Sequence, residues 1–415
     1  MSMEALRSLE QLEPALLVQH AGALVASLED SRYDVRMKAL QTLDELEPAA
    51  LAQHANAVVA RLEDSAWEVR RMALFTLGKL EPEMLALHAD AVHARLEDYH
   101  DGVRTEALVT LGKLEPATLA QHADAVVARL DDSDASVRYW ALDTLDKLEP
   151  ATLARQADAV VARLEDSDLD VRRGALDTLG KLDPATLAKY ADAVVARLEE
   201  EDSDDSHVSG AEVRQEALAT LGKLEPATLA QHAGAVVAML DDLDVDVCEA
   251  ALELLGELEP AVLAQYADAV VARLEDSAER VRYWAIATLG KLEPATLAQH
   301  ASAVVARLED SIWDVRVRAL RTLGELEPVT LAQYADSVVA RLEDYSFDVR
   351  TVALETLAKL EPATLAQHAG AVVARLEDSD ERMRGRALGL LRGLPRYVTR
   401  EYRVDVFDSF PRGVR

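Results

Sequence analysis

Cysteine and aromatic residues are scarce in this sequence of 415 residues, and Cys248 is its single cysteine. One cysteine excludes an internal disulfide and is typical of a reducing compartment. No apolar run reaches the roughly 18 residues that indicate a membrane-spanning helix. The N-terminus has neither an apolar signal core nor an Arg-rich transit pattern. We therefore expect a cytoplasmic protein without a membrane segment, and a nuclear or organellar location stays open.

Positive charge is scarce as well, because 44 Lys and Arg stand against 75 Asp and Glu and leave a net charge of −31. Nucleic-acid binding and docking on anionic lipid both need Lys and Arg, so the sequence predicts neither. A basic protein or peptide is the partner that this charge favours. The sequence also lacks an HExxH motif, a Gly-rich phosphate loop and a nucleophile elbow. We therefore expect no catalytic residue, no metal and no cofactor.

One stretch of 34 residues, best seen at 116–149, is repeated along almost the whole chain. A marker proline begins each of eleven copies, and nine of the ten steps between these prolines are 34 residues long. A period of this length is typical of solenoids, in which each copy buries its apolar faces against its neighbours. The copies start at Pro14, Pro48, Pro82, Pro116, Pro150, Pro184, Pro226, Pro260, Pro294, Pro328 and Pro362.

Each copy divides into two halves with helical periodicity. In copy four the first half has apolar residues at spacings of three, four and seven, namely Leu119, Ala123, Val126, Val127 and Leu130. The second half has a similar stripe, namely Val137, Ala141, Leu142, Leu145 and Leu148. No run inside the repeats alternates as a strand would. The sequence thus predicts an all-α solenoid of eleven helix pairs.

Polar residues are expected to begin the second helices and to join the copies. Ser133 is predicted to cap the second helix of copy four, and several copies place an acid three residues after the equivalent serine, close to a capping box. Two recurrent arginines, Arg129 and Arg138 in copy four, are expected to pair with Asp residues of the same and adjacent copies. Copy seven replaces them with Met239 and Cys248, which predicts a bend or weak joint or, alternatively, an apolar contact that is neutral for stability.

Three segments depart from the period. Residues 3–13 match only the second half of a copy, so we expect them to form a half-repeat cap. The acidic insertion 201–208 is predicted to be a mobile surface loop, either a tolerated insertion or a phosphorylation or docking loop. After it, Ser209 is expected to cap a helix together with Glu212. The repeat solenoid is therefore placed at 1–395, and a mildly basic tail or cap at 396–415.

The second half of each copy resembles HEAT repeats, because an acid precedes Val-Arg and because Ala-Leu and Leu-Gly follow, as at 170–180. The variety found in phycobilisome-lyase-like proteins is the most similar, within the wider group of HEAT and armadillo-type solenoids. The resemblance implies a right-handed α-α superhelix whose second helices line the concave side. The period also fits tetratricopeptide repeats, but the first half lacks their Trp, Gly and Tyr positions and begins with proline.

Positions that differ between copies are free to serve recognition, and most lie on the second helix, just after the Val-Arg pair and four residues on. Aromatic residues there suit binding, because they bury much area at low entropic cost. Tyr139-Trp140 and Tyr283-Trp284 form two patches. A third cluster is expected from Trp313 and Phe347 in adjacent copies nine and ten, beside Arg318 and Arg321. The alternative is that the rings pack sideways onto the next copy. The predicted partner-binding residues are Trp67, Phe75, Tyr139, Trp140, Tyr283, Trp284, Trp313, Arg318, Arg321 and Phe347.

One position of the first half is histidine in seven copies and tyrosine in three. Histidines one copy apart would be about 10 Å apart, too far to share a metal. Replacement by tyrosine also favours a packing or hydrogen-bonding role. The histidines are His20, His54, His88, His122, His232, His300 and His368, and the tyrosines are Tyr190, Tyr266 and Tyr334.

The sequence predicts a monomer that is not an enzyme and that acts as a protein-protein interaction scaffold. Its partner is expected to be a protein or peptide of basic character, held on the concave face. Two other functions stay open. The resemblance implies a bilin lyase-like or enzyme-subunit role as one alternative, and a purely architectural spacer in a larger assembly is the other.

Overall fold

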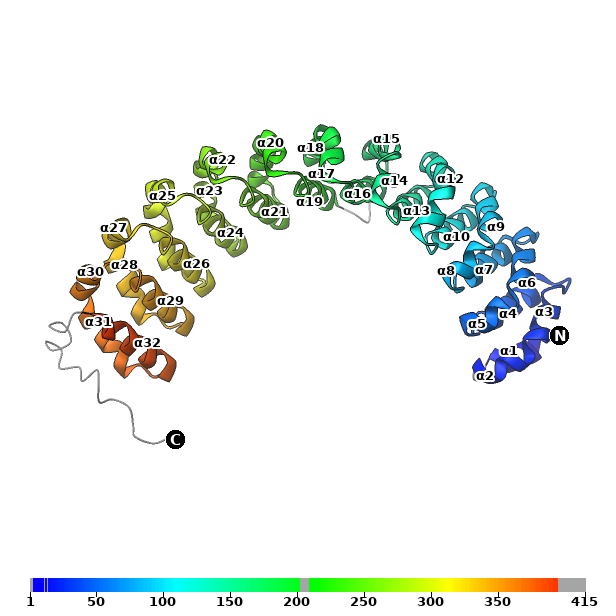
Figure 1. Ribbon diagram of the computed structural model, residues 1–415, viewed down its shortest axis with the longest axis horizontal. Coiled ribbons are helices and arrows are strands. Elements are labelled where there is room, and N and C mark those ends of the chain that lie inside the picture. Colours follow the sequence, from blue (N-terminus) through cyan, green and yellow to red (C-terminus); the bar gives the residue numbers. More distant parts are fainter. Residues whose placement is uncertain (1–2, 11, 13, 202–208, 395–415) are drawn as a thin grey trace. The chain divides into compact units, whose positions relative to one another are not determined.

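A computed structural model describes residues 3–10, 12, 14–201 and 209–394 (Figure 1). Every regular element in these residues is a helix, and the helices recur in pairs, so the predicted all-α solenoid is confirmed. The chain forms two compact units, unit 1 (Met1–Leu224) and unit 2 (Glu225–Arg415), which divide between copies six and seven. Within each unit the helix pairs lie side by side in chain order.

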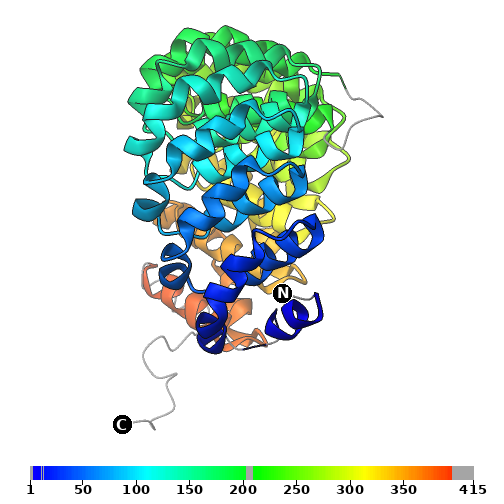
Figure 2. The same ribbon diagram turned by 90° about the vertical axis from the view of Figure 1, so that its right-hand side faces the viewer.

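The second helices form one layer in each unit, because every second helix packs against that of the next copy (Figures 1 and 2). In unit 1 they are α4 (Tyr33–Leu43), α7 (Trp67–Leu77), α10 (Asp101–Leu111), α13 (Ala135–Leu145), α16 (Leu169–Leu179) and α19 (Gly210–Leu221). In unit 2 they are α21 (Val245–Leu255), α24 (Glu279–Leu289), α26 (Trp313–Leu323), α29 (Phe347–Leu357) and α32 (Glu381–Arg392).

The first halves form the other layer. In unit 1 their α-helices are α2 (Pro14–Leu17), α3 (Ala21–Ser27), α5 (Pro48–Ala52), α6 (Ala55–Val59), α8 (Pro82–Ala86), α9 (Ala89–His93), α11 (Pro116–Leu119), α12 (Ala123–Ala128), α14 (Pro150–Leu153), α15 (Ala157–Val161), α17 (Pro184–Leu187) and α18 (Ala191–Val195). In unit 2 they are α20 (Pro226–Ala238), α22 (Pro260–Leu263), α23 (Ala267–Ala272), α25 (Pro294–Ala306), α27 (Pro328–Leu331), α28 (Ala335–Ala340), α30 (Pro362–Gln367) and α31 (Ala369–Ala374).

Most first halves are interrupted, so the single helix that their periodicity predicts is wrong for those copies. Only α20 and α25 run through without a break among the described residues. In copy four, His122 has φ −107° and ψ 1°, outside the helical region, and α12 starts after it. Short 3₁₀ segments such as η4 (Ala120–His122) and η5 (Arg129–Asp131) complete the half. Apolar spacing cannot distinguish such tight turns from a continuous helix, because both keep the same face buried.

The apolar stripes of the two layers meet in a core that continues from copy to copy within each unit. In copy four, Val137, Ala141 and Leu142 of α13 are fully buried, as are Val126 and Leu119 of the first half, which packs against α13. Full burial of one such aliphatic side chain contributes about 2 kcal/mol. The equivalent of Val137 is buried in all eleven copies, so each copy is stabilised chiefly by its neighbours.

The N-terminal helix α1 (Met3–Glu10) packs against α4 and buries Leu6 completely, as expected of a half-repeat cap. The predicted Ser209 cap is confirmed, because its hydroxyl accepts a hydrogen bond from the Glu212 amide at 3.3 Å. Most of the acidic insertion (202–208) and all of the tail (396–415) lie outside the described residues.

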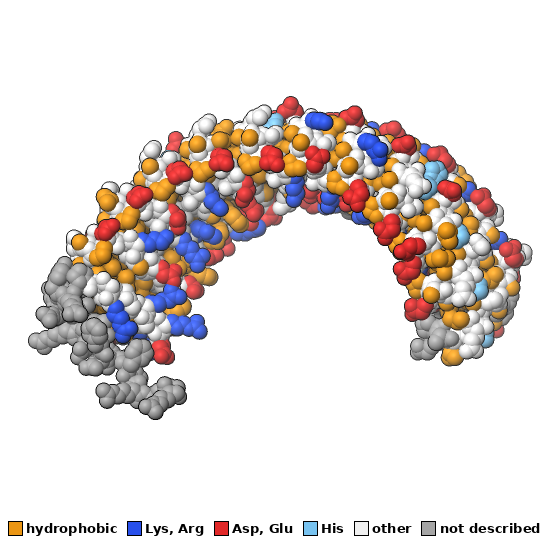
Figure 3. Space-filling model, viewed as in Figure 1, with side chains coloured by type: hydrophobic (Ala, Val, Ile, Leu, Met, Phe, Trp, Pro, Cys, Tyr) orange, Lys and Arg blue, Asp and Glu red, His pale blue; other side chains and the backbone are white. Residues whose placement is uncertain are grey.

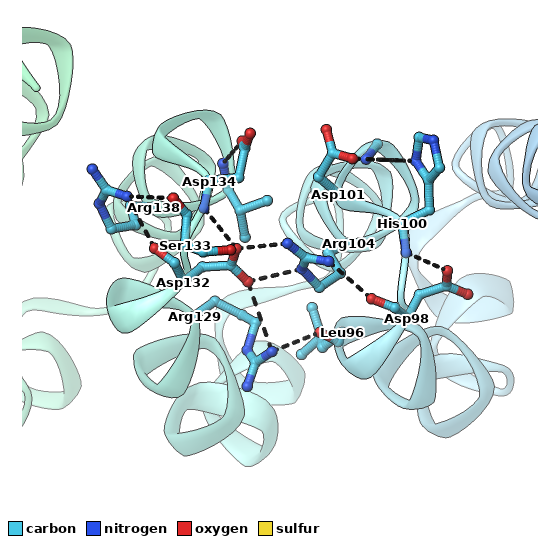
Figure 4. Close-up of polar contacts among 12 residues, drawn as sticks. Leu96, Asp98, His100, Asp101, Arg104, Arg129, Asp132, Ser133, Asp134 and Arg138 are labelled. Atoms are coloured by element: carbon cyan, nitrogen blue, oxygen red, sulfur yellow. Dashed lines mark hydrogen bonds and ion pairs between the residues drawn. The ribbon is translucent and has the colours of Figure 1, made fainter.

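A ladder of ion pairs joins neighbouring copies, as the recurrent arginines predict (Figure 4). Arg104 in copy three donates from Nε and Nη2 to the two carboxylate oxygens of Asp132 in copy four, at 2.8 and 2.6 Å. Its Nη1 donates to the Asp98 carbonyl at 3.0 Å. Such a bidentate pair uses the planar fork of arginine fully. Equivalent pairs within the units are Arg36–Asp64, Arg70–Asp98, Arg138–Asp166, Arg172–Glu200, Arg282–Asp310, Arg316–Asp344 and Arg350–Asp378.

The arginine of the first half joins the copies in the opposite direction. Arg129 donates to the Leu96 carbonyl and to Glu97 of the preceding copy, at 3.0 and 2.7 Å. The partner in the preceding copy is a glutamate in most copies, where aspartate was expected. The expected aspartate of the same copy is present, because Arg129 Nη1 lies 3.8 Å from Asp132. A buried threonine of the second helix adds a further link, because Thr144 Oγ1 donates to the Leu108 carbonyl at 3.1 Å.

The predicted serine caps are wrong outside Ser209, because the second helices start one residue later. In copy four the N-cap is Asp134, whose carboxylate accepts from the Val137 amide at 3.2 Å. Ser133 instead offers its carbonyl to Arg138 at 3.3 Å. Asp132 fixes this turn, because its Oδ1, which accepts from Arg104 Nη2, also accepts from the Asp134 amide at 3.0 Å. One aspartate therefore both shapes the turn and joins the copies.

Copy seven interrupts the ladder within unit 2. Cys248 is buried at the position of the ladder arginine, and its Sγ lies 3.2 Å from the Asp242 carbonyl. Asp276 of the next copy accepts from the Ala278 amide at 2.8 Å and is more exposed than Asp98 or Asp166. Burial and the nearby Asp242 raise the pKa of the Cys248 thiol to about 11, so the thiol is neutral at physiological pH.

Candidate recognition surface

The variable positions of the second helices lie at the surface of each unit, beside the buried stripe. Their side chains include aromatic, methionine and charged residues, and most are at least partly exposed, whereas Glu106, Val317, Thr351 and Val352 are buried. Figure 3 shows acidic side chains gathered along the second-helix edge of unit 1 and more Lys and Arg along the second helices of unit 2. The predicted binding residues are therefore accessible, and their immediate neighbours decide what each patch can do.

Trp67 and Phe75 line one groove of about 250 Å³ on unit 1. Both belong to α7, and Phe75 is 43% exposed. Its apolar lining is completed by Met37 of α4 and Met72 of α7. Methionine side chains adapt to irregular apolar surfaces, so this groove suits an apolar side chain of a partner.

Trp67 also packs sideways, as the alternative interpretation allows. Its ring stacks flat on His100 of the next copy, with centroids 3.8 Å apart and an angle of 7° between the planes. His100 is held in place because its Nδ1 accepts from the Gly102 amide at 3.1 Å. Trp67 is thus fixed before any partner arrives, while Phe75 remains free to make contacts.

Charged residues border the Trp67–Phe75 groove. Glu106 of α10 is 8% exposed, and its only ion pair in the described chain is a 3.4 Å contact with Arg71. Burial raises the pKa of the Glu106 carboxyl, and Arg71 offsets this in part. The groove therefore has an apolar floor beside a poorly compensated carboxyl group.

Tyr139 and Trp140 come together on α13. Their rings meet edge to face with centroids 5.7 Å apart. They line a cavity of about 330 Å³ with Asp168 and Asp170, which stand at the start of α16 in the next copy. This patch combines two aromatic rings with two carboxylates.

Tyr283 and Trp284 on α24 repeat the edge-to-face pair, with centroids 5.9 Å apart. Here the next copy covers the tyrosine, because the Arg318 guanidinium lies 4.5 Å from the ring centroid and donates to the hydroxyl. The sequence predicted Arg318 beside Trp313 and Phe347. Its contact with Tyr283 instead agrees with the alternative prediction, in which the rings pack sideways onto the next copy.

Trp313 and Phe347 occupy equivalent positions on α26 and α29. Trp313 is 43% exposed, and Phe347 has the Arg350 guanidinium 5.9 Å from its centroid. No ring contact joins Trp313 to Phe347 in the described part of the chain. Arg321 is exposed on the same helix as Trp313. These residues form separate contact points rather than one cluster.

Several surface residues escaped the sequence interpretation, which singled out aromatic residues on the second helix. Met37, Arg71, Met72 and Glu106 occupy the two positions after the Val-Arg pair, so their departure from the repeat was the available signal. Tyr99 and Tyr345 replace the serine before the second helix and cover ladder arginines, with Arg70 and Arg316 4.6 and 4.7 Å from the ring centroids.

The histidine position makes polar contacts with the preceding copy, as predicted. Tyr190 donates to Asp158 at 2.7 Å, and His300 lies 3.8 Å from Asp268. His122 instead meets His93, a histidine outside the row, with 3.0 Å between their Nδ1 atoms. Burial and the charge of His93 lower the pKa of His122. No group of three metal-ligating side chains occurs among the described residues.

Comparisons with known proteins bear on the fold of the chain. Residues 55–146 match the family model for HEAT repeats. No curated protein matches the sequence. Within the described residues, no helix has the length and apolar character needed to cross a membrane.

Solved structures of Kap121p share the fold. Kap121p bound to Pho4p aligns with a TM-score of 0.63 and 16% identity over 96% of this chain and 48% of Kap121p. Kap121p bound to the SUMO protease Ulp1p aligns with 0.60 and 15% over 96% and 47%. Kap121p bound to RanGTP aligns with 0.60 and 17% over 93% and 46%. This chain therefore spans about half the length of Kap121p and, at this identity, shares its fold.

Proposed function

We propose that this α-solenoid, of which residues 55–146 match the HEAT-repeat family model, is a monomeric, non-catalytic scaffold that binds a protein or peptide on the face formed by its second helices. The observation that carries this proposal is the set of exposed or half-exposed rings at the variable positions of that face. Copies other than copy seven keep the ladder arginine of the second helix, and the differences between copies gather on the face where we expect a partner to bind. Large aromatic anchors dominate binding energy at protein interfaces.

The charge of the chain supports a basic partner. With a net charge of −31, the protein attracts cationic segments at long range and disfavours nucleic acid. Kap121p, which has a similar fold, is known in complexes with protein partners such as Pho4p and Ulp1p. A scaffold role agrees with that precedent, and it needs no group beyond the side chains already described.

The proposal is tested by affinity capture from a source lysate with a variant in which Tyr139, Trp140, Tyr283 and Trp284 are changed to alanine. The matched control changes Tyr99 and Tyr345, which are exposed aromatics outside the variable face. Circular dichroism verifies that both variants stay helical. We expect the four-residue variant to lose a partner that wild type and the control retain. Equal capture by all three proteins contradicts a binding role for these rings.

A further inference from the structure

The two Tyr-Trp patches differ in one residue of the following copy. After Tyr283-Trp284, the position on the next second helix that faces the tyrosine is Arg318, whose guanidinium lies 4.5 Å from the Tyr283 centroid. After Tyr139-Trp140, the corresponding residue is Gly174. The chain thus contains the same aromatic pair twice, once with a guanidinium over the tyrosine and once without one among the described residues.

Gly174 directly adjoins the tyrosine that has no guanidinium. A Cβ added at Gly174 would lie 3.4 Å from Tyr139 Cδ2, an ordinary van der Waals distance. A side chain at this position would therefore begin beside the Tyr139 ring, as that of Arg318 does beside Tyr283. On the side of Asp168 and Asp170, the Tyr139-Trp140 patch faces a cavity of about 330 Å³.

The surroundings of Tyr139 also carry one more carboxylate than the equivalent positions beside Tyr283. Asp168 and Asp170 both line the cavity, whereas the residues at these positions in copy nine are Ile312 and Asp314. The Asp168 carboxylate accepts from the Val171 amide at 3.2 Å, and Asp170 has a partly exposed contact with Arg173 at 3.6 Å. Aromatic faces and carboxylates both attract cations.

We propose that Tyr139, Trp140, Asp168 and Asp170 bind the guanidinium of an arginine side chain presented by a partner peptide. Arginine is preferred to lysine because its planar, weakly hydrated head stacks on aromatic rings and pairs with carboxylates at the same time. In copy nine, Arg318 supplies a guanidinium to the tyrosine from within the chain. In copy five, Gly174 has no side chain, so the place beside Tyr139 is left for the arginine of a partner. This inference rests on the proposed scaffold function and specifies the chemistry of one of its contacts.

The site has its own spectroscopic reporter, because Trp140 is one of four tryptophans in the chain. Protein labelled with ¹⁵N-tryptophan gives an indole N–H signal for each, and a Trp140→Phe variant assigns the signal of interest. The probe is acetyl-arginine methylamide, with acetyl-citrulline methylamide as the neutral control of nearly identical shape. We expect the arginine compound to shift the Trp140 signal saturably and the citrulline compound to leave it unchanged.

Gly174→Arg is the sharpest variant, because it should place the chain's own guanidinium on Tyr139. Replacing a glycine inside a helix favours the helix, so the fold should persist. We expect the affinity for the arginine probe to fall about tenfold or more. Gly234→Arg is the matched control, since it adds the same charge at an exposed glycine whose Cβ position is open, and it should bind as wild type does.

A second variant, Asp168→Ser, removes a carboxylate while keeping a residue that can cap α16, and it should also weaken binding of the probe. The inference is overturned if the citrulline compound shifts Trp140 as the arginine compound does, if neither shifts it, or if both variants bind like wild type. Failure here is distinct from failure of the scaffold proposal. A partner captured by wild type, lost by the four-residue aromatic variant and retained by Gly174→Arg would leave the scaffold intact and reject the arginine site.

Discussion

Arg70 and Asp98 join copies two and three through two parallel hydrogen bonds of 2.7 and 2.6 Å, and both residues are less than a tenth exposed. Removing one member of a buried pair leaves an uncompensated charge and costs about 3–5 kcal/mol. Arg70→Ala should therefore lower the free energy of unfolding in urea by that amount. Arg386→Ala is the control, because the side chains of Arg386 and its partner Glu355 are both about half exposed, and it should cost about 1 kcal/mol or less. Equal losses of unfolding free energy in the two variants would mean that a ladder pair stabilises the protein no more than a surface ion pair does.

The ladder also predicts sensitivity to acid. Burial alone would raise the pKa of Asp98, but hydrogen bonds from Arg70 and the His100 amide outweigh it and lower the pKa below its ordinary value. A lowered pKa means that this stabilisation is present above the pKa of the unfolded state and is lost as the pH falls through that of the folded state. The stability gap between wild type and Asp98→Asn should be constant at neutral pH and should shrink below about pH 4. Urea unfolding at several pH values measures it, and a gap that widens in acid would contradict the assignment.

Glu106 predicts the opposite sign. Its carboxyl pKa is raised by burial, so the folded state holds the proton more tightly than the unfolded state. Stability at this site is therefore highest in acid and is lost as the pH rises through the raised pKa. Glu106→Gln should stabilise the protein at neutral pH and lose this advantage in acid, as followed by thermal unfolding. Glu83→Gln, at an exposed site, should leave the thermal stability unchanged both at neutral pH and in acid.

Copy seven offers a gain of stability. Cys248 stands where other copies place the ladder arginine. Copy seven therefore offers no ladder arginine to Asp276 of copy eight. Cys248→Arg should restore the pair and raise the free energy of unfolding by about 1–3 kcal/mol, the range for hydrogen bonds to charged groups. Cys248→Ala separates the effect of losing the thiol from that of gaining the guanidinium. If Arg and Ala prove equally stable, the missing pair is not a weak joint.

The repeat period predicted the helix pairs, the buried stripe and the ladder, because one pattern repeated eleven times constrains each position many times over. It did not predict the break in the first half, since the turn at His122 keeps the same face buried as a continuous helix would. It misplaced the caps, because the role of Asp132 depends on Arg104 of the preceding copy and not on local sequence.

The recognition surface was predictable only in outline. Variation between copies indicated positions on the second helices whose rings are partly exposed, but the residue that contacts each ring comes from the following copy and is not evident from one copy alone. Arg318 covers Tyr283, and His100 stacks on Trp67, whereas Tyr139 faces a cavity. Aligning each copy with the one that follows it would have revealed the exchange of Arg318 for Gly174.

Site-specific photo-crosslinking tests which face of the solenoid binds. A photoreactive phenylalanine replaces Phe75 or Trp313 on the second helices or, as matched controls, Leu87 or Val329 on the first halves, where these side chains are more than two-thirds exposed. Irradiation in source lysate should yield the same discrete crosslinked product from one or both second-helix positions and none from the controls. A product from Leu87 or Val329, with none from Phe75 and Trp313, would contradict binding on the second-helix face.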